Sequence, residues 1–258
     1  MFHRRPKLGL QDCRQHGADS RAELFIVEGD SASQAVCSLR DPEFQAVLPM
    51  QGKPANALKA SARTLRENAL FGELRDALGY GAIANSTAEI STTKKNSAEK
   101  DSAEKNSAVE NSKTPTSVDA ARCRYSRILL LFDPDADGIH GGALMLIYFY
   151  QQFPALLAAG RISVIRPPLF ELTYAETAHP AALRKSQLAY TEEQLRQLQR
   201  ELNLSGVVRL KTQRMRGLGG MPTELLRTTC IAPATRTAFR LGSADAQSAI
   251  AIFGGSQL

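Results

Sequence analysis

The chain contains no tryptophan, and aromatic residues make up only 6% of its 258 residues. Cysteine is also scarce: there are four, and no two of them form a Cys-x-x-Cys pair. This spacing argues against a disulfide scaffold or a zinc ribbon and favours a reducing compartment.

Long apolar runs are absent as well. The longest, residues 143–150, is far shorter than the roughly 20 residues that cross a bilayer. Residues 1–14 lack the apolar core of a signal peptide. We therefore expect a cytoplasmic protein, and we expect it to have no membrane partner.

The composition is otherwise that of a globular protein. Hydrophobic residues make up 43% of the chain, which is enough for the core of one large domain. Lysine and arginine total 32 against 26 for aspartate and glutamate, so the formal net charge is +6. This balance permits a polyanionic partner without requiring one.

Residues 84–118 differ from the sequence around them. They contain no aromatic residue, leucine or glycine, and a five-residue unit recurs in them as NSAEK, DSAEK and NSAVE. A period of five matches neither a helix nor a strand, so no face of this segment is apolar. We expect a disordered, low-complexity insertion.

The rest of the chain alternates between strand and helix patterns. Short apolar runs predict strands at residues 23–27, 45–49, 127–132 and 161–166. Helical spacing predicts helices at residues 31–39, 58–78 and 140–159, and Thr191 and Gln194 have the spacing of a capping box. Apolar strands separated by helices predict an α/β fold, with a parallel sheet and helices on both of its faces.

Three aspartates alternate directly after the third predicted strand, at Asp133, Asp135 and Asp137. Crowded carboxylates repel one another unless a cation neutralises them, and all-oxygen ligands select Mg²⁺, Mn²⁺ or Ca²⁺ over zinc. An EF-hand is excluded, because its twelfth position would be Leu144 instead of glutamate. The alternative is an acidic turn that only caps the following helix.

Glu28 lies at a second strand-to-helix junction, in the string VEGDSAS. Gly29 allows a sharp turn there, and Ser31 can cap the helix that follows. Glu28 and Asp30 could simply favour a helix N-terminus. If the first and third strands are neighbours, however, Glu28 joins the aspartates at the edge where open α/β sheets bind ligands.

Two basic loops complete the candidate residues. Lys53 follows Gly52, with Asn56 three residues later, and Arg216 precedes a glycine-rich turn. Loops of this kind suit backbone approach to phosphates. Ordinary solvated side chains are the alternative.

Five strings in this order carry a resemblance: ELFIVEGDSA, FQAVLPMQGKPAN, RILLLFDPDADGIH, RPPLF and QRMRGLGGM. Together they resemble the B subunit of bacterial type IIA DNA topoisomerases, gyrase and topoisomerase IV. The resemblance implies a TOPRIM domain, a Rossmann-like α/β fold, at residues 21–170, interrupted at 84–118. It also implies a lead-in at residues 1–20 and a small C-terminal region at 171–258.

The resemblance assigns roles to the acidic residues. Glu28 matches the family's catalytic glutamate, which also binds one Mg²⁺ ion. Asp133 matches the aspartate shared by both metal positions, and Asp135 the one that holds the other metal. Asp137 matches a third, supporting position. Mn²⁺ or Ca²⁺ can substitute for Mg²⁺ in binding.

Other positions match residues at or near DNA in this family. Lys53 and Asn56 match positions that touch DNA beside the cut, and Arg216 stands where the family usually has lysine. Asp30 and His140 are expected to support the site.

The implied function is Mg²⁺-dependent cleavage and religation of double-stranded DNA, as part of a type II topoisomerase of the ATP-hydrolysing class. The attacking tyrosine belongs to the family's A subunit, so this chain would be half of a cleavage centre and would associate with the nucleoid. Only about two dozen residues precede the first strand, so we expect no ATP site on this chain. A non-catalytic paralogue that binds DNA or the A subunit is one alternative, and a metal-dependent TOPRIM nuclease is another.

The sequence departs from the family pattern around the carboxylates. Phe132 and Ile139 replace small polar residues that flank the acidic loop, Pro134 replaces alanine, and Gly220 replaces the glutamate of the GLGEM string. The carboxylates are retained while their neighbours differ. The site therefore either works in a modified context or belongs to a paralogue that is losing activity.

Overall fold

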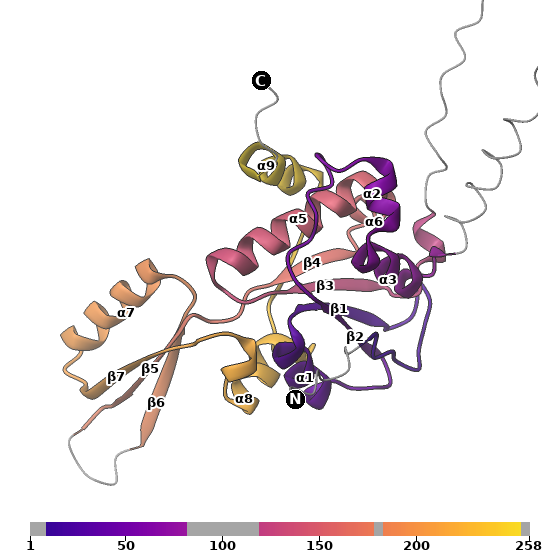
Figure 1. Cartoon of the computed structure of the whole chain (residues 1–258). Coiled ribbons are helices and arrows are strands. Elements are labelled where there is room, and N and C mark those ends of the chain that lie inside the picture. Colours follow the sequence, from indigo (N-terminus) through magenta and orange to yellow (C-terminus); the bar gives the residue numbers. More distant parts are fainter. Residues whose placement is uncertain (1–8, 82–118, 178–182, 254–258) are drawn as a thin grey trace, which may run out of the picture.

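The structure is a computed structural model that describes residues 9–81, 119–177 and 183–253. The insertion predicted at residues 84–118 lies outside these described residues. Figure 1 shows two unequal parts, a large α/β body and a smaller sheet beside it.

The large body is built on a five-stranded sheet. Its strands are β1 (Glu23–Glu28), β2 (Gln45–Met50), β3 (Arg127–Leu131), β4 (Ile162–Ile165) and β8 (Ala238–Arg240). Their order is β2-β1-β3-β4-β8, with the first four parallel and β8 antiparallel to β4. The predicted parallel sheet is confirmed, and a C-terminal strand extends it.

Helices cover both faces of this sheet (Figure 1). They are α1 (Asp30–Leu39), α2 (Ala62–Glu67), α3 (Ala69–Leu78), α5 (Ala136–Gln152), α6 (Pro154–Ala158), α8 (Thr223–Leu226) and α9 (Ser243–Phe253), with short turns η1 (Ala120–Arg122), η2 (Leu218–Gly220) and η3 (Arg227–Ile231).

Alternate side chains of β1 enter two separate cores. Leu24 and Ile26 pack with α3 and α5, while Phe25 and Val27 pack with α1, α8 and η2. A strand carries apolar residues on both of its faces only when both faces are buried. The burial of both faces of β1 therefore explains its continuous apolar run. Among the described residues, no helix is long and apolar enough to cross a membrane.

The smaller part is an antiparallel sheet of β5 (Phe170–Ala175), β6 (Arg184–Ala189) and β7 (Val208–Arg214), in the order β6-β5-β7. Helix α7 (Glu192–Leu204) packs on one face through Leu195 and Leu202. After β7 the chain returns to the large body, where it forms β8 and α9. The C-terminal region predicted at 171–258 therefore contains both a small sheet and a segment of the main fold.

Three predicted helix boundaries were wrong. The helix expected at 58–78 is two helices, because the Asn68 side chain accepts a hydrogen bond from the Phe71 amide and starts α3 anew. The helix expected at 140–159 begins at Ala136 and breaks before Pro154, which has no N–H to donate. Ser31 does not cap α1; the N-cap is Gly29, with φ 81°.

Candidate active site

Two strand ends bring the candidate carboxylates together. β1 and β3 are parallel neighbours with Val27 opposite Leu131, so Glu28 and the Asp133 loop leave the sheet at the same edge. Burial raises the pKa of Glu28, and the charges of Asp133, Asp135 and Asp137 raise it further. The predicted convergence of these residues is therefore present in the fold.

Asp133 is held by the segment that returns from the small sheet. Its Oδ1 accepts a hydrogen bond from the Leu218 amide at 2.8 Å. The preceding Gly217 has φ 113°, and a Cβ there would lie 2.8 Å from Asp133 Oδ2, so only glycine fits without a shift. Burial raises the pKa of Asp133, and the Leu218 amide opposes that rise. The carboxylate is thus fixed in one orientation.

Asp135 both belongs to the acidic cluster and caps α5. Its Oδ1 accepts a hydrogen bond from the Gly138 amide at 2.8 Å, which satisfies one free N–H of the first helical turn. A Cβ on Gly138 would lie 2.1 Å from the Asp133 carbonyl oxygen. The helix can therefore begin directly on the acidic loop because this residue is glycine.

Two of the predicted basic residues lie at the same cluster. Lys53 Nζ donates to Asp137 Oδ1 at 2.9 Å, and this hydrogen bond lowers the pKa of Asp137. Arg216 lines a cavity of about 200 Å³ together with Asp133 and Asp135. Positive side chains therefore border the carboxylates on two sides.

Asn56 and His140 are held by the end of α9. The Asn56 side chain donates to the Phe253 carbonyl at 3.2 Å, and the Phe253 ring stacks on His140 with centroids 5.0 Å apart. Asp30 accepts a hydrogen bond from the Gln51 side chain at 2.8 Å. Sequence analysis did not identify Phe253, because nothing near residue 253 indicates which distant residues it touches.

The donor set fits a divalent cation. Glu28 Oε2 is buried without a hydrogen-bond partner among the described residues, and buried polar atoms normally have one. Neighbouring carboxylates raise the pKa of Glu28, and a cation would remove that repulsion. Carboxylate oxygens are the ligands that Mg²⁺ prefers, although among the described residues the ligand atoms of Glu28, Asp133 and Asp135 do not all lie within 4.8 Å of one another.

A second cluster does not suit a metal ion. Asp12, Cys13 and His16 have ligand atoms within 4.8 Å of one another. Asp12 already accepts from Tyr125 Oη at 2.7 Å and pairs with Arg124. Although burial opposes ionisation, hydrogen bonds from Tyr125, His16 and Arg124 lower the pKa of Asp12 to about 2. Arg124 therefore already supplies the positive charge that a metal ion would bring to Asp12.

We expect Glu28→Gln to raise the melting temperature of the metal-free protein at pH 7. A carboxyl group whose pKa is raised in the fold destabilises that fold as it ionises. Stability is therefore lost as the pH rises from the ordinary value of 4.5 through the raised pKa of Glu28. Glutamine removes this loss, so the variant's stability should fall less steeply above pH 4.5.

Thermal denaturation in EDTA between pH 4 and pH 8 measures this effect. Added Mg²⁺ should raise the melting temperature of the wild type more than that of the variant. Glu193→Gln, at an exposed position in the first turn of α7, is the matched control and should leave the pH profile unchanged. A lower melting temperature for metal-free Glu28→Gln would contradict the burial and repulsion inferred at this site.

The sequence matches the Toprim domain over residues 23–167. It is 31% identical over 244 residues to the B subunit of DNA gyrase from Thermotoga maritima, covering 95% of this chain and 31% of that protein. It is also 31% identical over 223 residues to the B subunit of DNA topoisomerase 4 from a Staphylococcus epidermidis strain, covering 86% and 28%. Against the gyrase B subunit of Thermus thermophilus the identity is 30%, over 95% of this chain and 32% of that protein. The chain thus spans about a third of the length of these relatives.

Proposed function

The chain belongs to the Toprim domain family, and we propose that it forms the Mg²⁺-dependent half of a DNA cleavage and religation centre. In this proposal a type IIA topoisomerase A subunit supplies the attacking tyrosine, and double-stranded DNA is the substrate. The B subunits that it resembles carry the names of DNA gyrase and topoisomerase 4.

One observation carries the proposal. The ends of β1 and β3 bring Glu28 and the Asp133 loop to one edge of the sheet, where the aspartate charges influence Glu28 and a buried Glu28 oxygen lacks a partner among the described residues. Lys53 pairs with Asp137 in the same loop, and Arg216 lines a cavity with Asp133 and Asp135. A phosphodiester can approach an acidic cluster only if positive charge accompanies it, and this edge of the sheet can supply both the metal ligands and the basic side chains.

Each residue has a chemical role in this reaction. Bound Mg²⁺ would stabilise the negative charge that develops on the phosphate and the 3′ oxygen. Glu28, with its raised pKa, is suited to donate a proton to that oxygen in cleavage and to remove it in religation. Asp133 is oriented in advance by the Leu218 amide. Lys53 and Arg216 would hold the DNA backbone.

The burial of several tyrosines supports a nucleophile from a partner. Tyr80, Tyr125 and Tyr148 are packed into the core of the large body. Burial raises the pKa of Tyr80 to about 12, which opposes formation of the attacking phenolate. These three tyrosines are therefore unsuited as nucleophiles, and in this proposal the A subunit provides the tyrosine.

A reconstituted cleavage reaction tests the proposal. The chain is mixed with a type IIA A subunit, end-labelled duplex DNA and Mg²⁺, and the reaction is stopped with detergent. We expect DNA fragments covalently linked to the A subunit, and we expect EDTA to prevent them.

Two other results would favour the alternative functions. Fragments without a protein link, formed by the chain alone, would indicate a nuclease. Binding to DNA or to the A subunit with no cleavage under any metal would indicate a non-catalytic paralogue.

Lys53→Ala should weaken DNA binding equally across sequences. A lysine that neutralises one phosphate releases about one counterion, so its loss should reduce the slope of log K against log salt by about one. Base preference should not change, because phosphate contacts position the protein and do not read sequence. Asn56→Ala should cost less, because no charge is lost.

Fluorescence anisotropy at several salt concentrations gives these slopes. Lys185→Ala is the control, since Lys185 lies on β6 of the small sheet and pairs with Glu176. Parallel lines for wild type and Lys53→Ala would leave Lys53 without a contact to DNA.

A further inference from the structure

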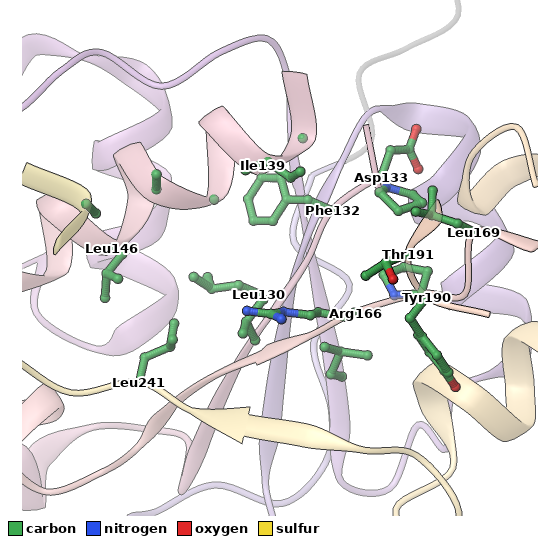
Figure 2. A pocket seen from close by; sticks show the side chains of 18 of the residues that line it. Leu130, Phe132, Asp133, Ile139, Leu146, Arg166, Leu169, Tyr190, Thr191 and Leu241 are labelled. Atoms are coloured by element: carbon green, nitrogen blue, oxygen red, sulfur yellow. The ribbon is translucent and has the colours of Figure 1, made fainter. Parts of the chain in front are cut away.

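An apolar cavity of about 570 Å³ lies between α5, strands β3 and β4, and the start of α7 (Figure 2). Its volume is within the range of small-molecule sites, about 300–1,000 Å³. Leu130 and Val164 line it from the sheet, and Leu146 lines it from α5. Apart from Asp133, the cavity shares none of the carboxylates proposed to hold metal.

Small residues on α5 explain why this space is empty. Gly138, Gly142 and Ala143 line the cavity from one side of the helix. A Cβ on Gly142 would lie 3.6 Å from the Phe132 ring, which is ordinary van der Waals contact. A side chain at position 142 could therefore fill part of this space, whereas one at position 138 would meet the Asp133 backbone.

The mouth of the cavity exposes large apolar side chains. Ile139 is 62% exposed and Tyr190 is 39% exposed, and both line the cavity. Exposed apolar side chains gathered at one hollow indicate a binding site.

Arg166 provides the charge that faces this space. Arg166 lines the cavity (Figure 2), and its guanidinium lies 5.3 Å from the centre of the Phe239 ring. Within the described part of the chain, it has no carboxylate within salt-bridge distance. The Asp133 carboxylate points away from Arg166 in Figure 2 and is bonded to the Leu218 amide. Glu192 lies at the exposed start of α7.

We propose that this cavity binds a small amphiphilic anion, with an apolar or aromatic body and one carboxylate or sulfonate group. The body would lie against Phe132 and Leu146, and the anionic group would pair with Arg166. A guanidinium binds such oxygens through two parallel hydrogen bonds, which gives the site both affinity and orientation. The inference does not depend on the proposed DNA cleavage activity.

The test uses 8-anilinonaphthalene-1-sulfonate, an aromatic sulfonate whose fluorescence rises in an apolar site. We expect saturable binding of about one equivalent to the full chain. Arg166→Gln should weaken binding about threefold, because Arg166 is exposed and an exposed ion pair contributes less than a buried one. Gly142→Leu should abolish binding by filling the cavity, and it should not harm the fold, since leucine favours a helix more than glycine does.

Two matched variants separate this site from general adsorption. Leu204→Ser removes an 89% exposed leucine at the end of α7 and should leave binding unchanged. Glu192→Gln removes the opposite charge from the same rim and should not weaken binding. N-phenyl-1-naphthylamine, which lacks the sulfonate, should bind the wild type and Arg166→Gln equally, and that result would show that Arg166→Gln is folded with its cavity open.

Three results would overturn the inference. Unchanged dye binding in Gly142→Leu would place the dye elsewhere. Loss of binding in Leu204→Ser would indicate adsorption on exposed apolar surface. If the wild type and Arg166→Gln bound the sulfonate dye with equal affinity, Arg166 would not bind an anionic group. The proposal that the ligand is an anion would then be wrong.

Discussion

Glu28→Gln should abolish DNA cleavage in the reconstituted reaction and leave DNA binding nearly intact. Covalent product should fall at least about hundredfold, because an amide can neither donate a proton to the 3′ oxygen nor remove it. Lys53 and Arg216 remain in place in this variant, so the affinity for duplex DNA should change little. Quantifying the linked product on a denaturing gel measures the first effect, and anisotropy measures the second.

The pH dependence gives a second measure of the same role. In cleavage the leaving 3′ oxygen gains a proton, so Glu28 must be protonated to donate it. Wild-type cleavage should therefore decrease as the pH rises through the pKa of this residue, which burial and the aspartates raise above 4.5 in the metal-free chain. Glu193→Gln, the control on α7, should cleave like the wild type. If Glu28→Gln retained full cleavage, the site would have to work through another proton donor, and the proposed role of Glu28 would be wrong.

Arg236→Ala should destabilise the fold by about 3–5 kcal/mol, the usual cost of leaving a buried charge unpaired. The side chains of Arg236 and Glu23 pair with each other and are only 2% and 5% exposed. Arg236 also donates to the Ile231 carbonyl at 2.7 Å, and Gln45 donates to Glu23 at 3.0 Å. Removing the arginine would leave the Glu23 carboxylate with the Gln45 hydrogen bond and with Arg127, whose Nη1 lies 4.0 Å from it, at the limit of an ion pair. Urea denaturation followed by circular dichroism gives the change in unfolding free energy.

Two further variants identify the cause of that loss. Arg227→Ala removes an exposed arginine that pairs with Glu224, and it should change stability little because water already screens that pair. The double variant Glu23→Leu with Arg236→Met should recover much of the stability, since an apolar pair of similar volume can replace a buried ion pair. A loss in Arg236→Ala no larger than that in Arg227→Ala would show that Glu23 is hydrated in solution.

Much of the acidic site could be predicted from the order of the amino acids. The apolar runs that became β1 and β3 end at Glu28 and shortly before Asp133, and a turn or helix follows each one. Strand-ending residues and loop carboxylates are local features, so they can be read from a few consecutive residues. The sequence analysis also gave the alternative that this acidic turn caps the following helix. The structure shows such a cap, because Asp135 caps α5 from within the acidic cluster.

The structure added the contacts between distant segments. The Leu218 amide that orients Asp133 is 85 residues away in sequence, and Glu23 pairs with an arginine 213 residues away. The stacking of Phe253 on His140 and the addition of β8 to the sheet are of the same kind.

Periodicity, capping and turn residues depend on neighbours within about one helical turn, so the amino-acid order alone predicts strands, helices and the acids at their ends. Which segments meet depends on how all the apolar faces are buried at once. The return of residues 218–253 to the main sheet is decided at that level. The empty space beside α5 is another such outcome, because Gly142 leaves room only where β3 and β4 lie opposite the helix.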